Sequence, residues 1–250
     1  MRLVTWNARV LNQPFKQKEV RLFLNNNKVD VVGLIETRVK ENKVQNIINK
    51  LIVDWISCCN YPMGRNGRIW LLWKNSAQIQ VEKLSKQFIH CTLSDSTSDF
   101  KSKLTVVYAK NDSPTRAQLW LELIGIGRLT HECWIIAGDF NNVLSSEDRL
   151  GSLYTLELRT LKATWCHYTF YNKQQGSSRV YSKIDWAFGK FPWMTAYSHV
   201  EADYLGSGIS DHSPILIQVC PPPPPPPPPN SNPKPFRLSK QFSIIQILVG

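Results

Sequence analysis

The sequence predicts an α/β protein in which two stacked, mixed β-sheets are flanked by helices. Many short apolar runs rich in Val, Ile, Trp and Tyr alternate with turn residues, a pattern typical of a long series of strands. Only a few amphipathic segments lie among them, too few to place one helix after each strand of a single doubly wound sheet. The 250 residues, 42% of them hydrophobic, are enough for a sizeable buried core.

The chain opens with a predicted strand–helix–strand unit. Residues 2–7 form an apolar run that ends at Asn7, and residues 17–26 have the apolar spacing of a surface helix. Residues 29–37 then read as a buried strand that closes on Glu36. Because such a unit places two parallel strands side by side, we expect Asn7 and Glu36 at equivalent strand ends.

The middle of the chain predicts a helix followed by a meander of strands. The helix covers residues 42–51, and the strands share short apolar runs bounded by turn residues, at 55–59, 68–73, 79–81, 88–93 and 104–108. Consecutive strands of this kind are expected to pair antiparallel. A further helix begins at Ser113, because proline at the next position is favoured in the first helical turn.

The segment 133–142, CWIIAGDFNN, is the strongest single indication of a functional site. An apolar strand ends at Gly138, and a carboxylate and two amides follow at once in Asp139, Asn141 and Asn142. Residues 153–165 show no clear pattern, after which strands are expected at 168–171, 179–188, 199–204 and 214–219. Polar clusters at Asp185 and at Asp211-His212 accompany these later strands.

A run of nine prolines at 221–229 marks the end of the folded domain, because proline has no N–H to donate within a sheet or helix. We therefore expect one domain over residues 1–220, followed by a polyproline and disordered tail over 221–250. The formal charge is +11, and residues 1–220 keep 27 basic against 19 acidic residues. Such an excess favours polyanionic partners, nucleic acid or an anionic surface.

The six cysteines form no Cys-x-x-Cys pair, and two of them lie in apolar runs, so reduced thiols of an intracellular protein are expected. A zinc site from His131, Cys133, Cys166 and His167 matches no standard spacing. The N-terminus leads directly into a strand without a signal sequence, and no apolar run reaches membrane-spanning length. We expect no membrane partner.

The polar strand ends together supply the groups that phosphodiester hydrolysis needs. A hard cation such as Mg²⁺ prefers carboxylate and amide oxygens, which Glu36 offers with Asn7 or Asp211 nearby. Asp139 is suited to orient or deprotonate water, and Asn141 to bind the phosphate. His212 can move a proton or stabilise the transition state, with Asp185 holding its imidazole in one tautomer.

Each of these residues also has a simpler explanation. Asn7 and Asn141 are common turn formers, Glu36 reads as a solvated charge, and Asp211 as a turn or cap residue. Asp185 alternatively faces solvent or pairs with Lys183 or Arg179, and Tyr108 is a strand aromatic. These explanations do not account for five polar breaks that each end or interrupt an apolar strand, which is why we favour a shared active site.

These pieces resemble, in kind and in order, the endonuclease/exonuclease/phosphatase superfamily. The residues that carry the resemblance are Trp6-Asn7, Ile35-Glu36-Thr37, Val107-Tyr108, Gly138-Asp139-Phe140-Asn141, Ser182-Lys183-Ile184-Asp185 and Ser210-Asp211-His212. Over residues 1–219 the chain is similar to the apurinic-type endonuclease domain of plant LINE-like non-LTR retrotransposons. The resemblance implies a four-layer α/β/β/α sandwich, cleavage of DNA with Mg²⁺ or Mn²⁺, a monomer and a nuclear location.

The resemblance also assigns a role to each matching position. It makes Glu36 the principal metal ligand, with Asn7 as an orienting group. Tyr108 and Asn141 would contact the phosphate, and Asp139 the water. Asp185 would pair with His212, which lies beside Asp211.

The sequence departs from the resemblance at two places. Val10 stands where these domains commonly have glycine after Asn-x-Arg, which predicts a disturbed turn at Asn7. Residues 151–165 form a short connection, as if a helix were lost, and such a loss is expected to uncover apolar sheet. Two other functions are therefore kept: an inert retrotransposon remnant that only binds nucleic acid, and a phosphatase on the same scaffold for inositol phosphates or sphingolipids.

Overall fold

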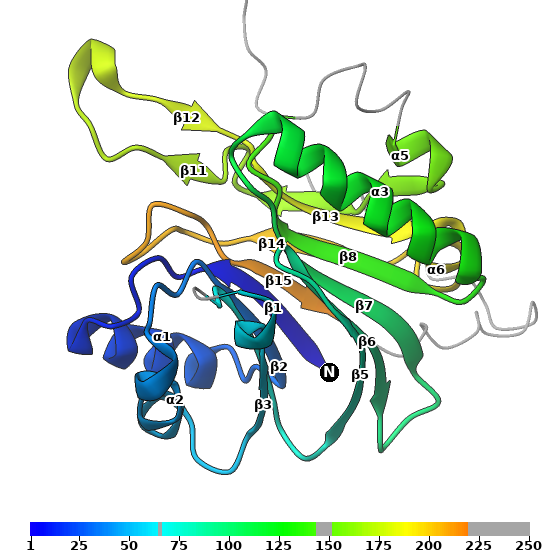
Figure 1. Ribbon diagram of the computed structural model, residues 1–250, viewed down its shortest axis with the longest axis horizontal. Helices are drawn as coiled ribbons and strands as arrows, with labels where there is room; N and C mark the ends of the chain where they lie inside the picture. The colour runs from blue at the N-terminus through cyan, green and yellow to red at the C-terminus, as the bar shows by residue number, and fades with distance from the viewer. Residues whose placement is uncertain (65–66, 144–151, 220–250) are drawn as a thin grey trace, which may run out of the picture.

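The computed structural model describes residues 1–64, 67–143 and 152–219, which form two mixed β-sheets packed face to face with helices on both outer sides (Figure 1). This arrangement confirms the predicted α/β/β/α sandwich. The expected polyproline tail at 221–250 and the polar loop at 145–149 lie outside the described residues. Among the residues described, no helix is long and apolar enough to cross a membrane, and every cysteine is a free thiol.

The first sheet has seven strands and carries the N-terminal unit. Its strands are, in spatial order, β10 (Lys162–Trp165), β14 (Glu201–Tyr204), β15 (Ile215–Gln218), β1 (Arg2–Asn7), β2 (Val31–Ile35), β4 (Ile69–Trp73) and β3 (Ile56–Cys59). β1 and β2 are parallel and joined by α1 (Pro14–Asn26), which confirms the strand–helix–strand opening. After a 3₁₀ turn at Glu41–Lys43, α2 (Val44–Leu51) packs with α1 on the outer face.

The second sheet has six strands and carries the Gly138-Asp139 segment. Its strands are, in spatial order, β5 (Ala77–Leu84), β6 (Phe88–Asp95), β7 (Lys101–Tyr108), β8 (Trp134–Asp139), β13 (Asp185–Lys190) and β9 (Leu158–Thr160). Parallel strands β7 and β8 are connected by α3 (Ser113–Leu129), which begins at the predicted residue because Asp112 accepts a 3.0 Å hydrogen bond from the Thr115 N–H. α3 and α5 (Ser152–Thr155) lie on the outer face.

The predicted single meander is wrong, because the chain changes sheet between β4 and β5. β3 and β4 pair in the seven-stranded sheet, whereas β5, β6 and β7 pair in the other. Apolar residues from both sheets then face one another across the central core. Strand periodicity is a local property and does not specify the sheet that a strand joins.

Two other predicted elements also differ from the structure. The run at 179–188 divides into β12 (Tyr181–Ser182) and β13, and β12 pairs with β11 (Phe170–Tyr171) in a hairpin that projects from the body (Figure 1). A short helix, α6 (Phe191–Ala196), follows β13 where none was expected.

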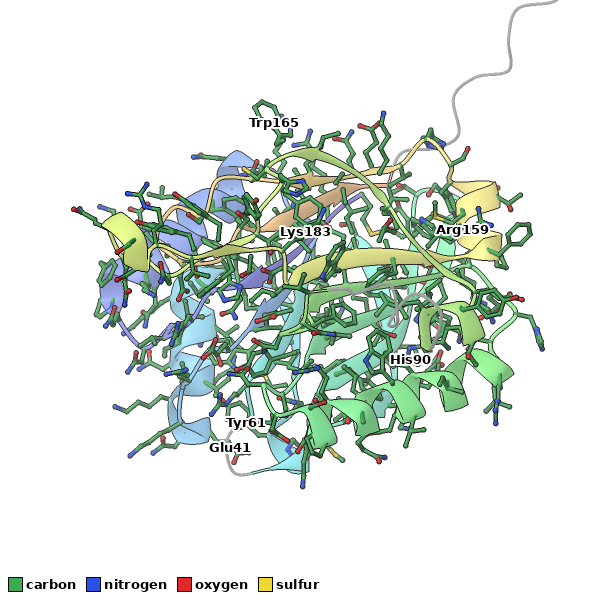
Figure 2. The ribbon with its side chains drawn as sticks, turned by 90° about the horizontal axis from the view of Figure 1, so that it is seen from above. Glu41, Tyr61, His90, Arg159, Trp165 and Lys183 are labelled. Atoms are coloured by element: carbon green, nitrogen blue, oxygen red, sulfur yellow. The ribbon has the colours of Figure 1, made fainter. Side chains whose placement is uncertain are left out.

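At β10 and β14 the outward face of the sheet is polar, so the expected uncovering of apolar sheet is not seen at these two strands. Ala202 and Tyr204 face the central core, so Glu201 and Asp203 face outward, where Lys162 and Thr164 bond to them. The exception is Trp165 at the end of β10, which is 85% exposed and projects from the molecule (Figure 2).

Strand direction brings the polar strand ends to one end of the sandwich. The parallel strands β1 and β2 end there, as do β7 and β8. β13 and β15 run antiparallel to β8 and β1, so both begin at the same end. The candidate active site lies at this end.

Candidate active site

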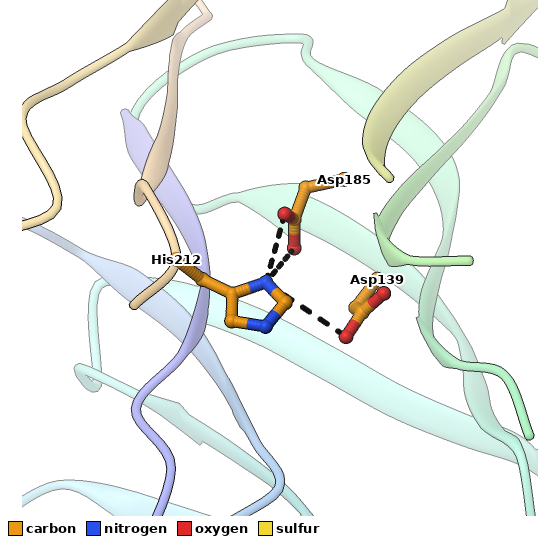
Figure 3. A group of neighbouring side chains, drawn as sticks. All are labelled: Asp139, Asp185 and His212. Carbon is orange, nitrogen blue, oxygen red and sulfur yellow. Dashed lines mark hydrogen bonds and ion pairs between the residues drawn. The ribbon is translucent and has the colours of Figure 1, made fainter. Parts of the chain in front are cut away.

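A buried cluster of two carboxylates and one imidazole lies at this end of the sandwich (Figure 3). Asp139 at the end of β8 lies opposite Asp185 at the start of β13 in the strand register. His212 Nδ1 lies 2.9 Å and 3.2 Å from the two carboxylate oxygens of Asp185. The three residues are 1–3% exposed. Asp185 therefore neither faces solvent nor pairs with Lys183, and the simpler explanation of this residue is wrong.

The cluster changes the proton affinity of its members. Burial alone would lower the pKa of His212, but the carboxylates of Asp185, Asp139 and Asp211 together outweigh it and raise that pKa to about 9. Burial, with the negative charge of Asp185 second, raises the pKa of Asp139 to about 7. At neutral pH the imidazole is therefore protonated, while Asp139 exchanges its proton close to neutrality.

Asn7 connects this cluster to the carboxylate of Glu36. Its fully buried Nδ2 lies 2.9 Å from Asp139 Oδ2, 3.0 Å from Glu36 Oε2 and 3.3 Å from His212 Nε2. An amide nitrogen has two hydrogens, and a protonated imidazole accepts none, so both go to the carboxylates. Its oxygen accepts the Arg9 N–H instead. Asn7 thus orients the two carboxylates.

Glu36 and Asp211 are held by arginines that the sequence argument did not include. Glu36 Oε1 accepts from Arg38 Nε at 2.9 Å and also from Arg38 Nη2. Arg9 Nη1 donates to Asp211 Oδ2 at 2.5 Å, and Arg9 Nε lies 3.7 Å from Glu36 Oε1. Although burial acts the other way, the charges of His212 and Arg9 lower the pKa of Asp211. Both carboxylates therefore have cationic partners.

The turns after β1 and β2 carry an unusual backbone. Val10, Glu36 and Arg38 have φ angles of 64°, 52° and 52°, in the left-handed region that disfavours side chains. The two turns bond to each other, with the Val10 N–H donating to the Glu36 carbonyl at 3.3 Å. The turn keeps the conformation that glycine would favour even though valine occupies it, and Asn7 remains in the network.

Tyr108 and Asn141 lie beside Asp139, at the ends of β7 and β8. The Tyr108 hydroxyl accepts a 3.3 Å bond from Arg68 Nη1, and burial, followed by the charge of Glu36, raises its pKa. The Asn141 N–H donates to Asp139 Oδ1 at 2.8 Å, and its Nδ2 donates to the Ala109 carbonyl at 2.7 Å. Asn141 therefore fixes one face of the Asp139 carboxylate.

The structure thus brings the eight predicted site residues to one end of the sandwich. Those the prediction missed are the three arginines and two hydroxyl residues that support the cluster. Ser210 Oγ donates to the Asn7 carbonyl at 2.6 Å, and Thr169 Oγ1 accepts the Asp185 N–H at 3.0 Å. The sequence position of two of these arginines could have predicted them, because Arg9 and Arg38 each stand two residues after a polar strand end.

Two packed mixed sheets flanked by helices, with a buried carboxylate–histidine cluster at their strand ends, place the chain in the α/β-sandwich class. The sequence profile of the family described as Endonuclease/Exonuclease/phosphatase matches residues 4–212, and the chain belongs to this family. Its members hydrolyse phosphodiesters or phosphate esters. No curated protein sequence matches the chain.

Several solved structures share the fold at low identity. The endonuclease domain of TRAS1, a telomere-specific non-LTR retrotransposon, matches with a TM-score of 0.66 and 13% identity over 87% of this chain and 97% of that one. TDP2 from D. rerio, complexed with a single-strand DNA product, gives 0.61 and 19% over 87% and 97%. A mannosyl-6-phosphatase from Bacteroides thetaiotaomicron gives 0.61 and 10% over 87% and 98%. These likenesses establish the fold.

The donor groups at this end of the sandwich suit the divalent cation that enzymes of this family generally use. Glu36 and Asp211 present carboxylate oxygens, the ligands that Mg²⁺ and Mn²⁺ prefer. Each of the two carboxylates already forms an ion pair with an arginine side chain. Asp139, Asp185 and His212 offer one donor atom each within 4.8 Å of one another. Asp185 and His212 are bonded to each other, and Glu36 and Asp211 are bonded to arginines, so a cation at either set would have to replace an existing partner.

Proposed function

We propose that the chain is a divalent-cation-dependent phosphodiesterase that cleaves DNA, of the kind found in plant LINE-like retrotransposons. The observation that carries the proposal is the continuous network through Asn7, which joins Glu36 to Asp139 and, through His212, to Asp185. A site for phosphodiester hydrolysis needs a cation position, a proton acceptor and a proton donor close together. The network supplies one group for each.

In this proposal Glu36, with Asp211, holds Mg²⁺ or Mn²⁺, which when bound neutralises charge on the phosphoryl oxygens. Asp139 accepts the proton of the attacking water, for which a pKa near neutrality is suited. His212 donates a hydrogen bond to the negative charge that develops, and Asp185 keeps its imidazole protonated and oriented. Asn7 aligns the Glu36 and Asp139 carboxylates.

Tyr108, Asn141 and the positive charge near Glu36 and Asp211 support DNA as the substrate. Tyr108 and Asn141 lie beside Asp139, where the scissile phosphate would have to bind. The half-exposed Arg9 and Arg38 side chains supply positive charge at the opening. Guanidinium groups bind phosphate in two-pronged fashion, and the net charge of +8 over residues 1–220 favours a long polyanion.

The test is nicking of supercoiled plasmid by the purified chain with Mg²⁺, which chelator should abolish. His212→Ala should lower the nicking rate at least about a hundredfold, because it removes the proposed donor. Asp211→Asn should lower it through the weakened cation position. His199→Ala, which changes an exposed histidine, is the matched control. Undiminished nicking by both site variants would show that the site is wrongly assigned.

Two alternatives have distinct outcomes in the same assays. Salt-sensitive DNA binding without cation-dependent cleavage would favour an inert remnant. Preferential hydrolysis of inositol polyphosphate over abasic or intact duplex would favour a phosphatase, an activity that the name of one structural neighbour carries. Parallel assays on these substrates separate the three functions.

A further inference from the structure

Three arginines border the candidate site, two of them bonded to carboxylates and one to a tyrosine hydroxyl. Arg38 and Arg9 donate to the carboxylates of Glu36 and Asp211, whereas Arg68 donates to the hydroxyl of Tyr108. The side chains of Arg9 and Arg38 are 40% and 42% exposed, against 8% for Glu36 and 14% for Asp211. The carboxylates are therefore fixed in the protein, while the guanidinium groups that cover them reach in from solvent.

The hydrogen bonds of Glu36 leave little room for another partner. Its Oε2 accepts from Asn7, and its Oε1 accepts two bonds from Arg38 with Arg9 Nε 3.7 Å away. A divalent cation at Glu36 needs the same oxygen lone pairs and would repel a guanidinium in contact with them. The cation and Arg38 therefore exclude each other from Oε1.

The backbone directs Arg38 to this position. Both Glu36 and Arg38 have φ near 52°, a conformation that costs free energy for residues other than glycine. Left-handed residues on either side of Thr37 return the Arg38 side chain toward the carboxylate two residues earlier. Strained backbone of this kind at a cleft is a reason to look for a role of the contact it produces.

We propose that Arg38, assisted by Arg9, competes with a divalent cation for the Oε1 oxygen of Glu36, so that the cation must displace its guanidinium group in order to bind. The displaced guanidinium is then free to bind the phosphate of the substrate, so cation loading and phosphate binding support each other. The inference rests on the proposed function in that it takes Glu36 as a cation ligand. It adds that this chain contains its own competitor for the cation.

Cation affinity without DNA tests the inference. The full chain is titrated with Mn²⁺ alone, and free Mn²⁺ is measured by its electron paramagnetic resonance signal. Arg38→Ala should bind Mn²⁺ about three- to tenfold more tightly than the unchanged chain, because the competitor is gone. Arg38→Lys, which restores a cation, should return the affinity toward the original value. Arg68→Ala, the matched control at the same cleft, should change it less than about twofold.

Thermal melting supplies a second measurement and a check on folding. In chelator, Arg38→Ala should melt at a lower temperature than Arg68→Ala, because the buried Glu36 carboxylate loses its partner. Saturating Mn²⁺ should then raise the melting temperature of Arg38→Ala by more than that of the unchanged chain.

Each outcome bears on the inference. Equal or weaker Mn²⁺ binding by Arg38→Ala would overturn it, as would equal tightening in Arg68→Ala, which would indicate only a general loss of positive charge. Absence of Mn²⁺ binding in all variants would overturn both this inference and the cation-dependent function. If the order of affinities holds but the chain nicks no DNA, the inference stands and the proposed function fails.

Discussion

The two sheets contribute the two halves of the candidate site, and they hold their carboxylates in different ways. On the six-stranded side, Asp139 and Asp185 face each other on paired strands and are 1% and 2% exposed. Gly138 allows β8 to approach the backbone of Val107 closely there. On the seven-stranded side, Glu36 follows β2 in a left-handed turn, and half-exposed arginine side chains hold it.

The difference separates a fixed half from an adjustable half. Strand pairing holds the backbone of Asp139 and Asp185, and burial encloses their side chains, so these two carboxylates are fixed in position. The Glu36 carboxylate, which is the proposed cation ligand, has Arg38 and Arg9 as partners, and their half-exposed side chains can move away into solvent. A site that must release and rebind a cation and a substrate needs both properties. Changes in the fixed half should therefore have the larger effects.

The largest effect is expected for Asp185→Asn in the fixed half. The backbone bond from residue 185 to Thr169 is kept, so the fold should persist, but the imidazole loses the charge that keeps it protonated. We expect the DNA-nicking rate to fall by about 10²- to 10⁴-fold. Asp203→Asn, on the outward face of β14, should leave the rate unchanged. If Asp185→Asn nicked DNA at the rate of the unchanged chain, the catalytic role assigned to the fixed half would be wrong.

A large effect on stability is expected for Gly138→Ala in the same half. A Cβ at this position would lie 2.1 Å from the Val107 carbonyl oxygen, and the residue has a φ of +142°. We expect the free energy of unfolding to fall by about 3 kcal/mol or more, measured by urea denaturation.

Gly125→Ala is the control for that substitution. This glycine lies within α3 with nothing within 4 Å of an added Cβ, so alanine should stabilise the chain by up to about 1 kcal/mol. Equal effects of the two substitutions would contradict the view that β8 requires glycine.

A pH profile of nicking should show the acid–histidine cluster directly. Asp139 must lose its proton to act as a base, so the rate should rise with pH through about 7. His212 must keep its proton, so the rate should fall as pH rises through about 9. In Asp185→Asn the upper limb should move to lower pH, since the carboxylate that raises the His212 pKa is absent. An upper limb that does not move would assign it to another group.

The smallest effect is expected in the adjustable half, for Val10→Gly. Valine is held at a φ of 64°, and glycine relieves this strain, so we expect a stabilisation of about 1 kcal/mol and nicking within about twofold. Val53→Gly, at an exposed residue without positive φ, should instead destabilise slightly. A lower melting temperature for Val10→Gly would mean that packing of the valine outweighs its strain.

The sequence predicted those parts of the fold and cleft that depend on local pattern. Apolar runs that stop at Asn7, Glu36 and Asp139 marked three strand ends correctly, because burial and strand length are written into neighbouring residues. Parallel connections then required these ends to meet, and the structure places them in one network.

The rest depended on contacts between distant segments. The passage from β4 to β5 into another sheet follows from which faces fill the central core, and no local pattern encodes that choice. The bonds of Arg9 and Arg38 depend on two left-handed turns, whereas valine at position 10 predicted only a disturbed turn at Asn7. The outward polarity of β10 and β14 likewise became clear only when their register was known.

The pairing of β1 with β15 also decides how this domain can be joined to other polypeptide. The Met1 amino group donates to the Val219 carbonyl at 3.2 Å, so both ends of the described sandwich meet at the start of β1. Asn7, which faces the cleft, is at the other end of that strand, roughly 17 Å away at about 3.3 Å per residue. A fusion at either end would begin on the side opposite the cleft and leave it open. A short linker between the two ends should also permit a circularly permuted chain.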